Sequence, residues 1–258
     1  MPAEVLAELG RLKVKEVIII GSAAAVSNAV EAQLTGAGYT VKRLAGANRY
    51  ETSVKVAEFM YATLEGAYKP EMAFFARGDN FPDALAVGPV AASALAPVLL
   101  VRPTSLPGEV AQAVDTMNFT WGFAIGDRNS VSESVLAQLN TLVQANGGEP
   151  QAVGRWAGAN RYETAVAVVE QALRYYWGWI DLDTLGVATG TNFPDALGGG
   201  AALGYYGSAV LLTNGTTLSP ATSAFLDRHQ YEIGRVDVFG GTNTVSDTVM
   251  GAIATKIE

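Results

Sequence analysis

The sequence contains no cysteine and a single histidine, and these absences exclude several kinds of chemistry. Without cysteine, the chain can form no disulfide, thiolate nucleophile or sulfur-ligated zinc site. One histidine, His229, is too few for a metal site built on a histidine pair. We therefore expect neither a metal ion nor any other cofactor.

Charge is also scarce, because 16% of the 258 residues are charged against about 25% in a typical soluble protein. The formal net charge of −8 argues against binding to nucleic acid or to an anionic membrane. The longest apolar stretch, residues 84–101, is interrupted by prolines and a glycine, which predicts a buried helix and a strand but no membrane span. No basic and apolar leader opens the chain, so we expect that a signal peptide is absent or was removed with the rest of a larger protein.

Long segments of the sequence occur twice, with an offset of 112 between Arg43 and Arg155. Residues 43–52 (RLAGANRYET) recur as RWAGANRYET, and residues 78–85 (GDNFPDAL) recur as GTNFPDAL. A third signature, an apolar strand with a glycine turn and a serine, occurs at 18–27, 123–132 and 238–246. Units of more than 100 residues are tandem domains and not short solenoid repeats.

The repeats predict three parts of the chain. Residues 1–40 are interpreted as the C-terminal half of a truncated preceding repeat, and 43–150 and 155–258 as two complete repeats. An apolar fragment of this kind leaves a strand edge open to association. We therefore expect residues 1–40 to dock on the first complete repeat, either completing its sheet or supplying an interface partner.

Within each repeat, short apolar segments alternate with segments of helical periodicity. Residues 72–76 (MAFFA) and 98–101 (VLLV) predict strands, and Pro82 suits the first residue of the helix between them. Continuous apolar strands joined by helices are typical of a parallel sheet covered on both faces. The sequence therefore predicts an α/β protein of tandem modules, each a mostly parallel sheet flanked by helices.

The glycine turns resemble phosphate-binding loops only superficially. The segment at 17–27 (VIIIGSAAAVS) has a strand, a glycine turn and a helix start, but it lacks the spaced glycines of a dinucleotide fingerprint and the P-loop lysine. A structural turn is the better interpretation. The serines after the three turns, Ser27, Ser132 and Ser246, are then expected to be helix N-caps.

No catalytic set can be assembled from the repeated residues. The chain has one histidine and no G-x-S-x-G elbow, which argues against a serine triad. The repeated carboxylates have structural roles available, because Glu51 completes a capping box with Asn48 and Asp83 lies in a first helical turn. We expect that the protein is not an enzyme, and a phosphate- or nucleotide-handling α/β enzyme stays as an alternative.

A polar set that recurs in both repeats is the candidate ligand-binding site. An arginine and an aspartate could pair and tie two loops together, or the loops could present a ligand site at the carboxyl ends of parallel strands. Both interpretations stay open for Arg49 and Asp83. The candidate residues are Arg43, Asn48, Arg49, Tyr50, Asn80 and Asp83, and in the second repeat Arg155, Asn160, Arg161, Tyr162, Asn192 and Asp195.

Four motifs occur in the same order in both repeats: R-x-x-G-A-N-R-Y-E-T, G-x-N-F-P-D-A-L, a Leu-Leu strand, and a glycine turn followed by V-S. With these motifs, nearly the whole chain resembles the cell-wall-binding repeat type 2 family of Gram-positive surface proteins. The resemblance implies small Toprim-like or Rossmann-like units about a pseudo-threefold axis. It also implies wall-facing arginines at Arg43, Arg49, Arg155 and Arg161, and module interfaces near Leu99–Leu100 and Leu211–Leu212.

The same resemblance implies a function outside the cell, at the cell wall or in a surface layer. Tandem modules of this kind hold a surface or secreted protein noncovalently on an anionic wall polymer, either teichoic-acid-like or a secondary wall polysaccharide. Neighbouring modules of the same or another chain are the other implied partners. A module that only assembles with its neighbours, without a glycan ligand, is the main alternative.

Overall fold

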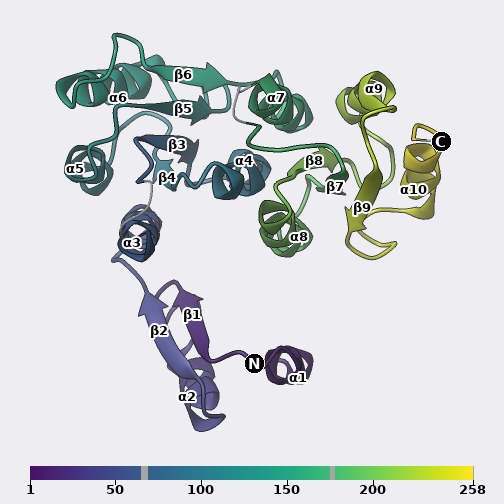
Figure 1. Ribbon diagram of the computed structural model, residues 1–258, viewed down its shortest axis with the longest axis horizontal. Coiled ribbons are helices and arrows are strands. Elements are labelled where there is room, and N and C mark those ends of the chain that lie inside the picture. The colour runs from purple at the N-terminus through teal and green to yellow at the C-terminus, as the bar shows by residue number, and fades with distance from the viewer. Residues whose placement is uncertain (65–68, 175–177, 258) are drawn as a thin grey trace. The chain divides into compact units, whose positions relative to one another are not determined.

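The computed structural model describes residues 1–64, 69–174 and 178–257, and the chain forms two compact units, Met1–Ala67 and Tyr68–Glu258 (Figure 1). Helices and strands alternate in both units, and the paired strands run parallel. This arrangement confirms the predicted α/β class. Across the described ranges, each helix is too short or too polar to cross a bilayer.

The first unit is built on a two-stranded parallel sheet. Its elements are, in chain order, α1 (Ala3–Arg11), β1 (Glu16–Ile20), α2 (Asn28–Gly36), β2 (Thr40–Leu44) and α3 (Arg49–Thr63). The register aligns Glu16 with Thr40 and Ile20 with Leu44. Because β2 opens the first complete repeat, residues 1–40 are joined to that repeat through its opening strand.

The second unit contains two parallel sheets, with the strand orders β4-β3-β5-β6 and β8-β7-β9. The first sheet and its helices comprise β3 (Met72–Arg77), α4 (Pro82–Ser93), β4 (Val98–Val101), α5 (Gly108–Thr116), β5 (Trp121–Ile125), α6 (Glu133–Ala145), β6 (Val153–Trp156) and α7 (Arg161–Arg174). The second sheet and its helices comprise β7 (Thr184–Thr189), α8 (Pro194–Tyr205), β8 (Ala209–Thr213), α9 (Pro220–His229), β9 (Arg235–Phe239) and α10 (Asp247–Ala254).

The edge strand of the four-stranded sheet comes from the following sequence repeat. β6 opens the second repeat, yet it pairs with β5 of the first, with Gly122 aligned with Val153 and Ile125 with Trp156. The pairing of β2 with β1 in the first unit follows the same rule. Residues 1–40 therefore join the first repeat through β1, which pairs with the opening strand of that repeat, and their docking on the rest of the repeat stays a prediction.

The two sheets of the second unit are joined by an apolar core in which α4 contacts β8 and α8. Leu85 on α4 clusters with Leu203 on α8 and with Leu212 on β8, and all three side chains are buried. The Leu-Leu strand of the second repeat thus lies where the repeats meet, as the resemblance implied. Because this contact is buried, it holds the two sheets together within the second unit.

The serines after the glycine turns behave as expected at two of three positions. The Ser132 hydroxyl accepts a hydrogen bond from the Val135 amide at the start of α6, and Ser246 caps α10 in the same way through Val249. Ser27 occupies the position before α2, but its side chain makes no capping hydrogen bond. The expectation of a serine cap is therefore wrong at Ser27.

Candidate functional site

The G-A-N-R-Y-E-T motif folds into a loop that caps its own helix. Before α3, the Asn48 Oδ1 accepts hydrogen bonds from the amides of Tyr50 and Glu51, at 2.8 and 2.9 Å. Before α7, the Asn160 Oδ1 accepts from the corresponding amides of Tyr162 and Glu163. The two asparagines of the candidate set therefore hold helix starts, as the capping preference of asparagine predicts.

The glutamate and glycine of the same motif complete this loop. The Glu163 Oε2 accepts a hydrogen bond from the Ala159 amide at 2.9 Å, and Glu51 does the same for Ala47 at 2.7 Å. A Cβ on Gly158 would lie 2.2 Å from the Glu163 Cβ, so only glycine fits there. Most of the motif is thus explained by helix capping, which leaves the arginine and the tyrosine for other roles.

Arg155 on β6 fastens the glycine turn that follows β5. Its Nη1 donates to the carbonyls of Gly126 and Asp127 at 2.9 and 3.0 Å, and its Nη2 donates to Val131 at 2.7 Å. The guanidinium therefore satisfies carbonyls that the tight turn leaves without strand partners. We call this arrangement the arginine latch.

The first unit contains a second arginine latch. The Arg43 Nη1 donates to the carbonyls of Gly21 and Val26 at 2.8 and 2.9 Å, and the same guanidinium pairs with Glu31. Both latches join the opening strand of a repeat to the turn before it. The role of Arg43 and Arg155 in a wall-facing set stays a prediction, although their donors are directed at protein carbonyls.

The F-P-D-A-L loop places an aspartate against the glycine turn of the same sheet. Asp83, in the first turn of α4, is 7% exposed, and its Oδ2 lies 2.4 Å from where a Cβ on Gly126 would stand. The equivalent Asp195 Oδ2 lies 2.7 Å from the same point on Gly240. Both glycines also have a positive φ, of 96° and 119°. Glycine is therefore favoured at this position for two reasons, the backbone conformation of the turn and the closeness of the aspartate.

The glycine turn does not have the open amides of a phosphate loop. The Gly126 amide donates to the Trp156 carbonyl at 2.8 Å, and the Gly21 amide donates to Leu44 in the same manner. After Gly126, the Asp127 Oδ1 accepts hydrogen bonds from the Asn129 and Ser130 amides. A carboxylate of the protein therefore occupies the position that an anionic ligand would take, which supports the structural interpretation of this turn.

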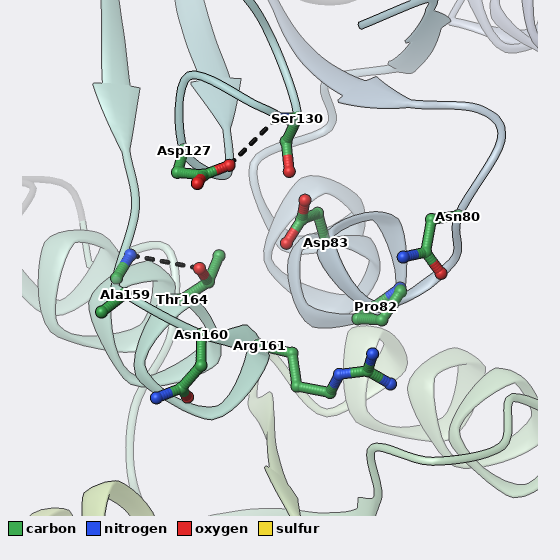
Figure 2. Close-up of a pocket in the computed structure, with 10 residues that line it drawn as sticks. Asn80, Pro82, Asp83, Asp127, Ser130, Ala159, Asn160, Arg161 and Thr164 are labelled. Atoms are coloured by element: carbon green, nitrogen blue, oxygen red, sulfur yellow. Dashed lines mark hydrogen bonds between the residues drawn. The ribbon is translucent and has the colours of Figure 1, made fainter.

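A polar cavity of about 130 Å³ opens between these elements (Figure 2). One side is formed by the F-P-D-A-L loop and the glycine turn of the first repeat, and the other by the arginine loop of the second repeat. In Figure 2, Asp83 faces Ser130 while the Arg161 side chain extends toward the loop of Asn80 and Pro82. The lining residues are Asn80, Pro82, Asp83, Asp127, Ser130, Gly158, Ala159, Asn160, Arg161 and Thr164.

The carboxylates of this cavity differ in their electrostatic surroundings. Burial raises the pKa of Asp83, although the hydrogen bond with Ser130 and the charges of Arg77 and Arg161 act in the opposite direction. Burial also acts to raise the pKa of Asp127, but hydrogen bonds from Asn129 and Ser130 outweigh it and leave that pKa lowered. Asp83 therefore keeps its proton to a higher pH than Asp127 does in the folded protein.

Arg161 lies at the junction of the two repeats. Its Nη1 donates a hydrogen bond to the Gly190 carbonyl at the end of β7, and its guanidinium carbon lies 5.9 Å from the centre of the Phe81 ring. Tyr162 packs beside it, because a Cβ on Gly190 would lie 2.9 Å from the tyrosine ring. Arg161 therefore contacts elements of both sheets while lining the cavity.

The structure brings only part of the predicted set together. Asn80, Asp83, Asn160 and Arg161 share the cavity of the second unit, whereas Asn192 and Asp195 lie at the equivalent end of the last sheet, and Arg43, Asn48, Arg49 and Tyr50 belong to the first unit. Sequence reasoning missed Asp127 and Ser130. The signal was the position of both residues directly after the repeated glycine turn, which shares an end of the sheet with Asp83.

The fold and the cavity define a tandem α/β repeat protein whose polar site is shared by consecutive repeats. The chain belongs to the Cell wall binding domain 2 (CWB2) family, whose profile matches residues 43–136 and 155–250. This membership places the chain at the cell wall or cell surface. Both matched ranges begin at the arginine of a latch, so the family repeat and the sheet have different boundaries.

Two curated proteins of Bacillus subtilis (strain 168) are similar to the chain. It is 27% identical over 254 residues to the N-acetylmuramoyl-L-alanine amidase LytC, and the alignment covers 98% of this chain and 46% of that protein. It is 28% identical over 249 residues to the Amidase enhancer, which covers 96% of this chain and 31% of that protein. The chain therefore spans less than half the length of these relatives.

Solved structures of two Clostridium difficile proteins share the fold. Cwp8 matches 99% of this chain and 41% of its own with a TM-score of 0.80 and 24% identity. Cwp6 matches 83% of this chain and 31% of its own with a TM-score of 0.69 and 22% identity. The first match includes almost every residue of this chain, so the α/β repeat architecture is common to both proteins.

Proposed function

We propose that the chain is a noncovalent, noncatalytic anchor that binds an anionic wall glycopolymer, teichoic-acid-like or a secondary wall polysaccharide, and holds a secreted protein outside the cell. Membership of the CWB2 family supports the wall as the target. The observation that carries the proposal is the cavity shared by the F-P-D-A-L loop and Arg161. It combines a guanidinium with carboxylate and amide groups in a recess that fits one small polar group of a polymer.

The chemistry of the cavity suits a charged sugar unit. The Arg161 guanidinium is a planar donor that pairs well with a phosphate or carboxylate oxygen. Asp83 and Asn80 supply acceptors for sugar hydroxyl groups beside it. A glycopolymer carries both kinds of group on adjacent units, so one site can bind the anionic group and the sugar hydroxyl groups at the same time.

The acidic balance of the protein adds selectivity to this proposal. The protein has a net charge of −8, and Asp83 and Asp127 line the cavity, so long-range electrostatic attraction does not favour the binding of a polyanion. Binding then depends on short-range pairing at Arg161, which weakens as salt screens the charges. We expect retention on walls to decrease with ionic strength.

Co-sedimentation with purified Gram-positive walls tests the proposal. Arg161→Gln removes the cationic group of the cavity and is expected to weaken wall binding about tenfold, the effect of one charge-assisted hydrogen-bonded pair. Arg235→Gln is the matched control, because Arg235 is an exposed arginine paired with Asp237 away from the cavity. Walls stripped of their anionic polymer should retain neither protein.

Two outcomes would contradict the proposal. Equal binding of the unaltered protein to complete and stripped walls would show that the anionic polymer is not the ligand. Equal binding of the Arg161→Gln and Arg235→Gln proteins to complete walls would remove the cavity from recognition. Thermal unfolding of both variants shows whether the loss of the Gly190 contact, and not of the ligand pair, explains a decrease.

A further inference from the structure

The polar cavity of the second unit has more acidic than basic groups in its lining. Asp83 and Asp127 both line it, and Arg161 is the one cationic side chain among the described residues of the lining. With both carboxylates ionised, two negative charges therefore stand against one positive charge. An anionic polymer unit that enters the cavity meets a repulsion that the single guanidinium offsets only in part.

Charged groups face Asp83 from three elements. Arg77 approaches from the end of β3, Asp127 from the turn after β5 and Arg161 from the start of α7. The Arg77 guanidinium is already paired with Asp79, through hydrogen bonds of 2.7 and 2.9 Å, and it does not line the cavity. Neutralising an additional negative charge inside the cavity therefore requires a change at one of the two carboxylates.

Asp83 is the carboxylate that can take up a proton. Its side chain is buried, which raises its pKa, and the negative charge of Asp127 acts in the same direction. Asp127 instead accepts hydrogen bonds from the Asn129 and Ser130 amides, at 3.0 Å each, and its pKa is lowered. A proton that enters the cavity is therefore held at Asp83.

The last sheet shows that the turn does not need two acidic groups. Asp195 has the same relation to Gly240 that Asp83 has to Gly126, but Gly241 stands where the first repeat has Asp127. The glycine turn after β9 forms without this second carboxylate. The pair of carboxylates is thus a property of the cavity, and the fold of a repeat does not require it.

We propose that the anionic unit of the polymer enters the cavity together with one proton from solution, which the Asp83 carboxyl holds and donates to that unit in a hydrogen bond. This inference rests on the proposed function and adds the regulation of the same site by pH. A protonated carboxyl gains an O–H donor and keeps an acceptor oxygen for a sugar hydroxyl. Arg161 and Asp83 then bind the anion as two donors, and the cavity loses its excess negative charge. Wall binding is consequently stronger at acidic pH than at neutral pH.

Co-sedimentation with purified Gram-positive walls, complete and stripped of anionic polymer, tests the inference at constant ionic strength between about pH 4.5 and pH 8, above the ordinary aspartate pKa. Retention of the unaltered protein on complete walls is expected to decrease with pH, by up to about tenfold in affinity per pH unit, the limit for one coupled proton. Asp83→Asn should remain bound across the range, because its amide supplies a donor and an acceptor without charge. Asp115→Asn removes an exposed carboxylate of α5 outside the cavity, and its retention should follow that of the unaltered protein.

Proton uptake gives a second test that needs no variant. In a weakly buffered suspension, binding of the unaltered protein to complete walls should remove up to about one proton per bound chain from solution. Polymer-dependent retention that does not change with pH, or that decreases equally for Asp83→Asn, would overturn the inference and leave the proposed function standing. Retention that increases with pH would also overturn it and would indicate a cationic group in the polymer unit. Equal retention on complete and stripped walls would instead overturn the proposed function itself.

Discussion

At the scale of single residues, one carboxylate and one glycine explain much of the repeated sequence. The Asp83 Oδ2 stands where a side chain on Gly126 would begin, and the pair Asp195 and Gly240 has the same relation. The arginine of the following repeat then holds the carbonyl of Gly126 from the other side. Three motifs that lie far apart in the sequence are therefore needed to form one turn.

Gly126→Ala is expected to lower the free energy of unfolding by about 1–3 kcal/mol, because it combines a positive φ with contact between the new methyl group and Asp83. Gly147→Ala is the control for backbone strain alone, since Gly147 has a φ of 94° with open space around it. Urea denaturation should show a clearly larger loss for Gly126→Ala. Equal losses would mean that the Asp83 carboxylate moves away from the new methyl group at little cost in free energy.

The raised pKa of Asp83 predicts a dependence of stability on pH. Between the ordinary aspartate pKa and the raised folded value, the folded protein binds more protons than the unfolded chain, so this group makes the protein less stable as pH rises through that window. Asp83→Asn removes the effect. The melting temperature of the variant relative to the unaltered protein should therefore increase from acidic toward neutral pH. A pH-independent difference would show that Asp83 titrates as it does in the unfolded chain.

At the scale of secondary-structure elements, the arginine latch attaches each opening strand to the turn before it. Arg155→Lys keeps the charge but cannot reach three carbonyls at once, because the lysine ammonium lacks the planar fork of arginine. We expect a loss of about 2 kcal/mol in the free energy of unfolding, from carbonyls left without donors. Denaturant titration measures it. Unchanged stability would indicate that water replaces the guanidinium.

The elements themselves could be predicted well from the sequence. The strand expected at 98–101 is β4, and the expected helix start at Pro82 is the start of α4. These predictions succeed because apolar runs, proline and asparagine caps act over a few residues. Of the capping box predicted at Asn48 and Glu51, the hydrogen bond from the Glu51 amide to the Asn48 Oδ1 is confirmed, whereas the Glu51 carboxylate accepts from the Ala47 amide, one residue before the cap.

The candidate site was less predictable because it depends on which strands become neighbours. The repeated polar residues of one repeat are natural partners in a sequence comparison, but β6 carries the arginine loop of the second repeat to the sheet of the first. Asp83 therefore shares its cavity with Arg161. Parallel pairing between distant segments leaves little signal in the local sequence. The three-dimensional pairing of β5 with β6 is therefore needed to identify Arg161 as the residue that shares the cavity with Asp83.

At the scale of the whole molecule, residues 1–40 are expected to stabilise the strand that opens the first complete repeat. Removing residues 1–40 takes away β1, the partner of β2, and the turn and Glu31 that Arg43 contacts. Amide hydrogen exchange of β2 should then become faster, because β2 loses its pairing with β1, while the four-stranded sheet keeps its protection. Faster exchange in β3 or β5 would show that the second unit depends on the fragment.

The strand that each repeat gives to the sheet before it has a consequence for how such chains lengthen. A gene segment of 112 codons can be duplicated from any starting point, and the inserted copy still provides one opening strand and receives another. The cavity and the arginine latch are regenerated at the new junction, because each is built from two consecutive copies. Recombination can therefore change the number of modules without a new interface evolving. In the proposed anchoring function, each insertion raises the valency of the anchor by one site.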